Sequence, residues 1–415
     1  MYFKRTVRLF FCFSTFFVCH KTLFKVKLVL YTTNLEICDI LYVRVWVVIM
    51  SEMKFRGVIV DYIDISAKPE KGFNFPFKII IPKKLSDNPD LIYACNLPKN
   101  ESENCSTMEE LIERTKEDFC SIDPMLTHLC LTNGNPMIIP FVPRLKDFRP
   151  NFLGRDCLTN NFKVSEYDEK YKKDMYLYNN LADQHKSIIQ YAIDCLKNKE
   201  INVDEKIIIS GYSEGAKFAT HFALLHPEII KSVIAGGTGG VISMPIDYMD
   251  GYEFLYPTGT SGLKKFDFDS FRNISFFYYI GKEDRTDPAM PNFDDYHYMD
   301  ENGNDCILKD ECGNKTPFVD ENGKQLLKLD ENGNYTAKYN LFSDSEVNAI
   351  NNVLGTVIQK RFIKQQEIYS NLGLNATFKL YSGNHKTIFD NRKEIFDDVD
   401  SFLRENLSKK VQKLK

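Results

Sequence analysis

A strand, a tight turn and a helix follow one another near the middle of the chain. Residues 206–210 read Lys-Ile-Ile-Ile-Ser, an apolar run without polar alternation that is typical of a buried strand. Residues 211–215 read Gly-Tyr-Ser-Glu-Gly, and residues 216–225 continue with a helical pattern. Glycines are needed on both sides because a Cβ there would collide with neighbouring backbone, and the strained turn makes the Ser213 hydroxyl project. The pattern predicts a nucleophilic serine at a helix N-terminus; a purely structural turn is the alternative.

Apolar runs alternate with helical patterns from about Phe55 onward. This alternation favours a single α/β domain, with a parallel or mixed sheet covered by helices on both faces. Strands are predicted at Gly57–Ile65, Phe75–Ile81, Leu91–Cys95, Met137–Val142, Lys206–Ser210, Ser232–Ala235, Ile274–Ile280 and Thr377–Tyr381. Helices are predicted at Tyr171–Lys197, Ala216–Leu225, Glu346–Leu372 and Glu394–Gln412.

Composition argues against several classes of protein. The 415 residues include 53 Lys and Arg against 57 Asp and Glu, so the net charge of −4 offers no global basic surface for nucleic acid. None of the 11 cysteines forms a Cys-x-x-Cys pair, which removes the usual zinc and thioredoxin spacings. We therefore expect a globular domain with a sizeable core, no nucleic-acid partner, no metal and no organic cofactor. Nothing in the sequence indicates an oligomeric state.

The first 53 residues differ from the rest of the chain. The start is basic and is followed by an apolar run at 9–19, as in a secretory signal or anchor, but no small-residue cleavage site follows. Upstream sequence ahead of a true start at Met50 or Met53 is one alternative, and an additional strand or membrane-surface element is another. A start at Met50 or Met53 favours the cytoplasm, whereas a signal in residues 1–20 implies secretion. The run is too short for a stable membrane span in any of these cases.

A repeat interrupts the domain in its C-terminal half. Asp-Glu-x-Gly recurs every ten residues over 300–333, and three copies read Asp-Glu-Asn-Gly. Asn-Gly between short apolar runs is typical of a type I′ hairpin, so a small β-hairpin insertion is expected over 290–340. A calcium loop is the alternative, because oxygens alternate from Asp300 and Glu311 falls twelfth. Asp305 stands where such a loop has its glycine, which favours the plain turn repeat.

A serine nucleophile needs a base and a group that orients the base. In chains with this strand–turn–helix serine the acid follows the serine, and the histidine follows the acid. His385 meets this order, because it lies directly after the last predicted strand and before the terminal helix. The other six histidines are placed elsewhere: His20, His128 and His185 precede the serine, His221 and His226 lie on or at the end of the next helix, and His297 lies beside the repeat.

Asp284 is the predicted acid. It lies three residues after Gly281, which ends the apolar strand at 274–280, and a carboxylate there is well placed to reach the histidine loop on a neighbouring strand. Asp287 and Glu283 are the alternatives in the same loop. The sequence thus predicts a Ser213, His385 and Asp284 triad.

With these residues the chain resembles the α/β-hydrolase family, from about Phe55 to the C-terminus. The resemblance rests on Gly211–Gly215, on Gly281-x-x-Asp284 and on Gly383-x-His385, in that order. Further stretches resemble a bacterial-type branch of serine esterases and hydrolases: Pro140–Arg144, Gly154–Asp156 and Ala235–Gly240.

The resemblance implies a mostly parallel eight-stranded sheet with helices on both sides, and an oxyanion hole made by two backbone N–H groups. One N–H would come from Glu214, the residue after the nucleophile, and the other from the loop after the third strand. That loop reads Cys-Asn-Leu-Pro-Lys over 95–99 instead of the common His-Gly form, so the second donor would be Asn96 or Leu97.

The sequence therefore predicts a serine hydrolase that cleaves an ester or similar acyl bond of a small-molecule or acylated substrate, through an acyl-enzyme intermediate. Segment 242–271 is expected to act as a lid and, with the repeat insertion, to set specificity, because loops after the carboxyl ends of strands line ligand sites in open α/β sheets. The alternatives are a serine peptidase of the same fold and a non-catalytic binding or surface protein on a hydrolase scaffold.

Overall fold

The computed structural model describes residues 50–95, 105–117, 123–143, 171–240, 243–284, 297–299, 305–307, 342–355 and 357–413. Contacts divide the chain into two units, Met1–Ser51 and Glu52–Lys415. Residues 1–49 lie outside the described ranges, and the predictions for a signal, an anchor or an upstream extension fall there. The fold is therefore that of the second unit.

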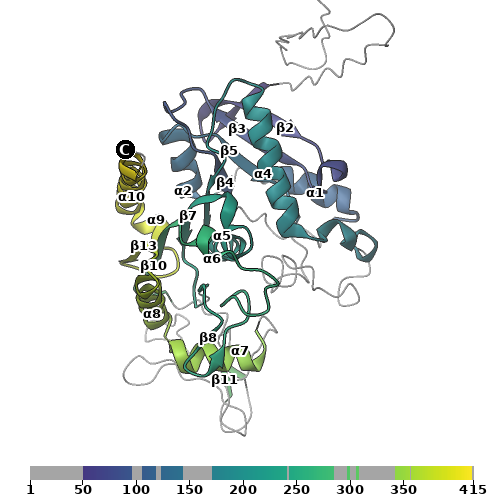
Figure 1. Ribbon diagram of the computed structural model, residues 1–415. Coiled ribbons are helices and arrows are strands. Elements are labelled where there is room, and N and C mark those ends of the chain that lie inside the picture. The colour runs from purple at the N-terminus through teal and green to yellow at the C-terminus, as the bar shows by residue number, and fades with distance from the viewer. Residues whose placement is uncertain are drawn as a thin grey trace, which may run out of the picture. The chain divides into compact units, whose positions relative to one another are not determined.

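A nine-stranded sheet forms the centre of this unit (Figure 1). In spatial order its strands are β1 (Ser51–Phe55), β2 (Val58–Ile65), β3 (Phe77–Pro82), β5 (Met137–Pro140), β4 (Ile92–Ala94), β6 (Ile207–Tyr212), β7 (Ile230–Gly236), β10 (Ser275–Gly281) and β13 (Asn375–Tyr381). All neighbours from β5 to β13 pair in parallel, so the sheet is mostly parallel, as predicted. The ninth strand is β1, which includes Met53 from the segment assigned to the leader.

β3, which contains three consecutive isoleucines at 79–81, is buried along its whole length. It nevertheless runs antiparallel to both of its neighbours, β2 and β5. The unbroken apolar run therefore reflects burial on both faces of the sheet and not the direction of the neighbouring strands.

Helices cover both faces of the sheet, and two adjacent residues of β10 show this. Side chains of successive residues in a strand point to opposite faces. The ring of Phe277 packs against Phe402 of α10 (Arg392–Lys413) with centroids 5.4 Å apart, whereas Tyr278 packs against Tyr369 of α8 (Ile358–Asn371) at 5.7 Å. The α10 face also carries α2 (Pro124–Thr127), η4 (His128–Thr132) and α9 (Thr387–Asp390), and the α8 face carries α4 (Leu181–Lys197) and α5 (Glu214–Leu225).

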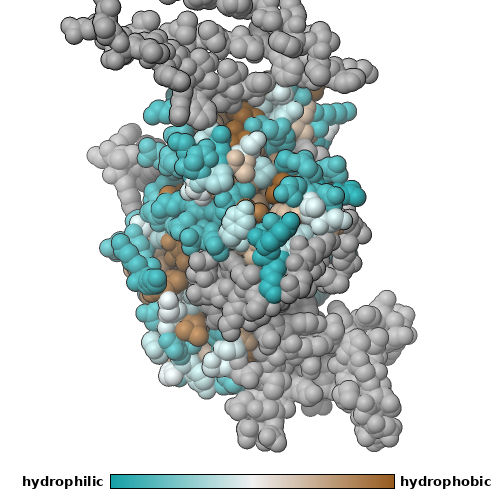
Figure 2. All heavy atoms as spheres, turned by 90° about the vertical axis from the view of Figure 1, so that its right-hand side faces the viewer, coloured by the Kyte–Doolittle hydropathy of each residue, from teal (hydrophilic) through white to brown (hydrophobic). Residues whose placement is uncertain are grey.

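The outer surface over α1 (Met108–Glu117) and α4 is largely hydrophilic. Figure 2 shows this face with polar residues around isolated hydrophobic ones. Both helices are amphipathic, so their apolar sides are available to pack inward. None of the helices in the described ranges is long and apolar enough to cross a bilayer.

Two predicted helices are interrupted, and the prediction of continuous helices was wrong at both places. Tyr171–Lys197 divides into a 3₁₀ helix, η7 (Lys172–Tyr178), and α4, with Asn180 at φ 51° between them. Glu346–Leu372 divides into α7 (Asp344–Ala349), the π-helical turn η9 (Ile350–Leu354) and α8, with Gly355 at φ 92°. Asparagine and glycine adopt left-handed backbone at the lowest cost, which explains why the breaks fall there.

The segment after β7 and the helices before α8 share a separate hydrophobic cluster. Met244 and Phe254 pack in it with residues of α7 and η9, including Val347 and Ile350. A short antiparallel hairpin, β8 (Tyr248–Met249) with β9 (Tyr252–Glu253), projects from this segment. The predicted specificity segment is thus one packed module with the chain that returns from the insertion.

The described part of the insertion consists of two short strands. β11 (His297–Met299) pairs antiparallel with β12 (Asp305–Ile307), on either side of the first Asp-Glu-Asn-Gly copy. The rest of the repeat, and with it the calcium alternative, lies outside the described residues.

Candidate active site

The residues from Gly211 to Gly215, here called the serine turn, connect β6 to α5. Ser213 has φ 57° and ψ −118°, a strained conformation for a residue with a side chain, and its N–H donates to the Gly236 carbonyl at 2.7 Å. A Cβ on Gly211 would lie 2.4 Å from the carbonyl carbon of Gly215, and a Cβ on Gly215 would lie 2.2 Å from the Cys95 carbonyl oxygen. Glycine is therefore required at both ends of the turn.

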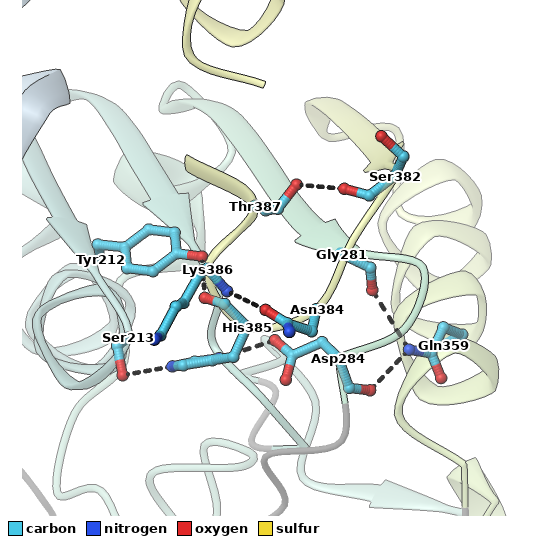
Figure 3. A network of polar contacts seen from close by, with 10 residues as sticks. All are labelled: Tyr212, Ser213, Gly281, Asp284, Gln359, Ser382, Asn384, His385, Lys386 and Thr387. Carbon is cyan, nitrogen blue, oxygen red and sulfur yellow. Dashed lines mark hydrogen bonds and ion pairs between the residues drawn. The ribbon is translucent and has the colours of Figure 1, made fainter. Parts of the chain in front are cut away.

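Ser213, His385 and Asp284 form a hydrogen-bonded chain (Figure 3). His385 Nε2 lies 2.8 Å from Ser213 Oγ, and His385 Nδ1 lies 2.8 Å from Asp284 Oδ2. A carboxylate only accepts, so Nδ1 carries the proton and Nε2 accepts from the serine hydroxyl. The three side chains come from the C-terminal ends of β6, β10 and β13.

The acid loop and the histidine loop support each other through their backbones. The Asp284 side chain is fully buried, and the backbone N–H of Asp284 donates to the Gly281 carbonyl at 3.1 Å. The Glu283 N–H donates to the Gly383 carbonyl at 3.0 Å. A Cβ on Gly281 would lie 2.3 Å from the carbonyl oxygens of Gly383 and Asn384, so the loops are in close contact. Of the three acids considered, the structure brings Asp284 to the histidine, and Asp287 lies outside the described residues.

Of the two predicted oxyanion donors, one lies within the described residues and the other lies outside them. Glu214 begins α5 directly after the serine, so its N–H is at the N-terminal end of that helix. Asn96 and Leu97 lie outside the described residues. Their predecessor Cys95 is placed, because its carbonyl oxygen contacts Gly215 and its N–H donates to the Ser210 carbonyl at 2.9 Å. Cys95, the last described residue before them, therefore lies directly beside the serine turn.

Burial shifts the pKa of two groups near the serine turn, Cys95 and Asp123. It raises the pKa of the Cys95 thiol well above its usual range, so this cysteine stays neutral and is a poor nucleophile. Burial also raises the pKa of Asp123 to about 6, against two backbone hydrogen bonds from Met125 and Leu126 that lower it. These bonds cap α2, which gives Asp123 a structural role.

Three of the histidines set aside from the sequence have partners or packing roles in the described fold, namely His185, His221 and His128. His185 is buried beside Tyr93, and His221 is buried on α5 next to Tyr256. His128 contacts Asp400 of α10 at 3.0 Å. Among the described residues, no group of three or more His, Cys, Asp or Glu side chains could hold a metal ion.

Two residues of the site were not predicted. The Tyr212 hydroxyl donates a hydrogen bond to the His385 carbonyl (Figure 3). Gln359 of α8 donates hydrogen bonds to the carbonyls of Gly281 and Asp284. Tyr212 lies inside the serine turn, so its position was a usable signal. Gln359 lies 75 residues beyond Asp284, and no local pattern connects it to the site.

No protein-family model matches the chain, and neither does any curated protein. Several solved structures resemble it at low similarity. LpqC, poly(3-hydroxybutyrate) depolymerase from Bordetella parapertussis, is 10% identical, with 78% of this chain and 83% of that chain covered and a TM-score of 0.37. Poly(aspartic acid) hydrolase-1 from Sphingomonas sp. KT-1 is 10% identical, with 84% and 98% covered and a TM-score of 0.40. The siderophore hydrolase EstA from Aspergillus nidulans is 12% identical, with 79% and 89% covered and a TM-score of 0.33.

Likenesses at this level say nothing of what this protein binds or cleaves. The fold follows from the chain's own features. Its sheet is mostly parallel and covered on both faces, and Ser213 lies on a strained turn from a central strand into a helix. The chain order from that serine to Asp284 and His385 is the one expected for this architecture. The protein has the α/β-hydrolase fold.

Proposed function

We propose that this protein is a serine hydrolase that cleaves an ester or similar acyl bond. The proposal is carried by the geometry of His385, which lies 2.8 Å from Ser213 Oγ through one ring nitrogen and 2.8 Å from Asp284 Oδ2 through the other. This arrangement supplies a base within reach of the serine and a buried carboxylate that orients the base.

In the acylation step, His385 Nε2 accepts the hydroxyl proton of Ser213 while Oγ attacks the substrate carbonyl carbon. The carbonyl electrons move to oxygen, and the N–H of Glu214, with that of Asn96 or Leu97, stabilises the oxyanion. Asp284 stabilises the imidazolium that forms. When the tetrahedral intermediate collapses, the imidazolium returns its proton to the leaving oxygen, and the acyl group stays on Ser213.

In the deacylation step, His385 takes a proton from water, and the hydroxide attacks the acyl carbon. Collapse of the second tetrahedral intermediate releases the carboxylic acid, and the proton on Nε2 returns to Ser213 Oγ. The triad thus returns to its starting state without metal or organic cofactor in any step.

Ser213→Ala provides the direct test. We expect the wild-type protein to hydrolyse short p-nitrophenyl esters and to be labelled by a fluorophosphonate probe. We expect the variant to lose the labelling and to lose turnover by about 10⁶-fold. Equal labelling of wild type and Ser213→Ala would overturn the assignment.

We further propose that segment 242–271 and the 290–340 insertion set substrate choice. The first packs with α7 and η9 into the module around Met244 and Phe254, and the second follows β10 and Asp284 in the chain. The same triad also serves peptidases, so a panel of p-nitrophenyl esters of increasing acyl length, run beside peptide p-nitroanilides, tests esterase against peptidase. Faster turnover of the anilides would favour the serine peptidase.

A further inference from the structure

The loop that carries Asp284 lies in the chain between the strand β10 and the insertion. β10 ends at Gly281, Asp284 follows, and the chain then departs into the insertion. It returns through α7 and η9 into α8, and Gln359 is the second residue of that helix. Gln359 therefore lies at the contact between the start of α8 and the loop that follows β10.

The contact between these two places is specific. Gln359 Nε2 donates to the Asp284 carbonyl at 2.8 Å and to the Gly281 carbonyl at 3.3 Å. Both partners only accept hydrogen bonds, so the amine end of the side chain must face them. In Figure 3 the amide of Gln359 lies between the two carbonyls, on the side of Asp284 away from Ser213.

These bonds add to the hydrogen bonds that hold Asp284 in place. Its N–H donates to the Gly281 carbonyl, its carbonyl accepts from Gln359, and its carboxylate accepts from His385. A displacement of about 1 Å in a group of this kind costs up to about 100-fold in rate.

We propose that Gln359 is a positioning residue, which holds the backbone of the acid loop so that Asp284 stays aligned with His385. This inference rests on the proposed serine hydrolase function and adds a residue of α8 to it. Gln359 acts through Asp284 and has no contact with substrate in this role.

Gln359→Glu is the informative variant. The side chain keeps its length, but the amide NH2 group that donates to the two carbonyls becomes a carboxylate oxygen, which repels them. Turnover of a p-nitrophenyl ester is measured in the full chain and divided by the number of sites titrated with a fluorophosphonate. We expect kcat per titrated site to fall by about 10- to 100-fold, with KM changed by less than about two-fold. Gln359→Ala should show a fall of the same kind, and it covers the case in which the glutamate variant does not fold.

Gln184→Glu is the matched control. Gln184 of α4 also donates Nε2 to two main-chain carbonyls, of Leu177 and Asn179, both at 2.7 Å, and its Oε1 accepts from the Asn74 N–H; none of these partners belongs to the triad or its loops. This variant should lower the melting temperature and keep kcat per titrated site.

Three outcomes would overturn the proposal. Both Gln359 variants could keep kcat per site within about two-fold of wild type, or Gln184→Glu could lower kcat as strongly as they do. Either result would remove Gln359 and leave the serine hydrolase proposal intact. A wild-type protein without Ser213-dependent labelling would overturn both proposals together.

Discussion

The hydroxyl of Tyr212 donates a hydrogen bond to the backbone carbonyl of His385, which joins the serine turn directly to the histidine loop. Tyr212 is the residue before Ser213, and the accepting carbonyl belongs to His385 itself, so this hydrogen bond lies next to both side chains of the Ser213–His385 contact. Burial raises the pKa of the Tyr212 hydroxyl, which therefore remains a donor across the working pH range of a hydrolase. The ring also lies 5.7 Å from the His385 ring, centroid to centroid.

Tyr212→Phe removes this hydrogen bond and keeps the ring. A bond of this type is worth about 1 kcal/mol, so we expect kcat on a p-nitrophenyl ester to fall about five-fold with little change in KM. Tyr178→Phe is the control, because Tyr178 also donates to a main-chain carbonyl, that of Pro143 at 2.9 Å. An equal loss of kcat in both variants would show that Tyr212 has no particular role.

Asp284→Asn tests the choice of acid. An amide in place of the carboxylate turns the imidazole into the wrong tautomer, and the comparable change in a Ser-His-Asp protease lowers kcat about 10⁴-fold. We expect a loss of that order in steady-state ester hydrolysis. Asp287→Asn and Glu283→Gln, the alternatives in the same loop, should each keep kcat within about ten-fold of wild type. The reverse pattern would move the acid to Asp287 or Glu283.

Gly281→Ala tests the contact between the acid loop and the histidine loop. The new methyl group would lie 2.3 Å from two backbone oxygens, which must move apart, so unfolding should become easier by about 1–3 kcal/mol and kcat should fall. Gly57→Ala meets no atom within 4 Å, and only its φ of 87° is unfavourable, which costs about 1 kcal/mol. Urea unfolding and ester hydrolysis of both variants give the comparison. Retained activity in Gly281→Ala would mean that the two loops tolerate separation.

His185 predicts a loss of stability in acid. Burial lowers its pKa from 6.5 to about 3, with a smaller contribution from His226. As the pH falls below 6.5, the unfolded chain binds a proton that the folded protein does not, so stability is lost progressively toward pH 3. For this group alone, the free energy of unfolding should drop by about 2 kcal/mol between pH 8 and pH 5.

The check is urea unfolding of wild type and His185→Gln at pH 8 and pH 5. Glutamine can still accept from the Tyr93 hydroxyl and does not titrate. The variant should be less sensitive to pH by about the same 2 kcal/mol. Equal pH dependence in the two proteins would contradict the prediction.

Local patterns were enough to predict most of the sheet. Each predicted strand from Gly57–Ile65 to Thr377–Tyr381 has its counterpart, because apolar runs of this length record burial on a strand directly. The helix breaks at Asn180 and Gly355 carried a signal, an asparagine or glycine inside a helical pattern, that was outweighed by the apolar periodicity around them.

Local patterns also indicated some residues of the site and missed others. Ser213, Asp284 and His385 lie at strand ends with recognisable neighbours, so their meeting could be anticipated. Gln359 could not be found, because its role depends on how a long excursion returns to the sheet and on a contact across 75 residues. Such contacts leave no periodicity in a single sequence.

Because Gln359 bonds the carbonyl of Asp284, the two ends of that excursion are fastened at one place. The length of a chain between two fixed points has only a weak, logarithmic effect on the cost of closing it. We therefore expect the part of this chain between Asp284 and α7 to tolerate changes in length, whereas α7 and η9 must be kept because they pack with Met244 and Phe254. Insertions and deletions in this stretch would then change the protein's surface while the loop of Asp284 keeps its anchor on α8.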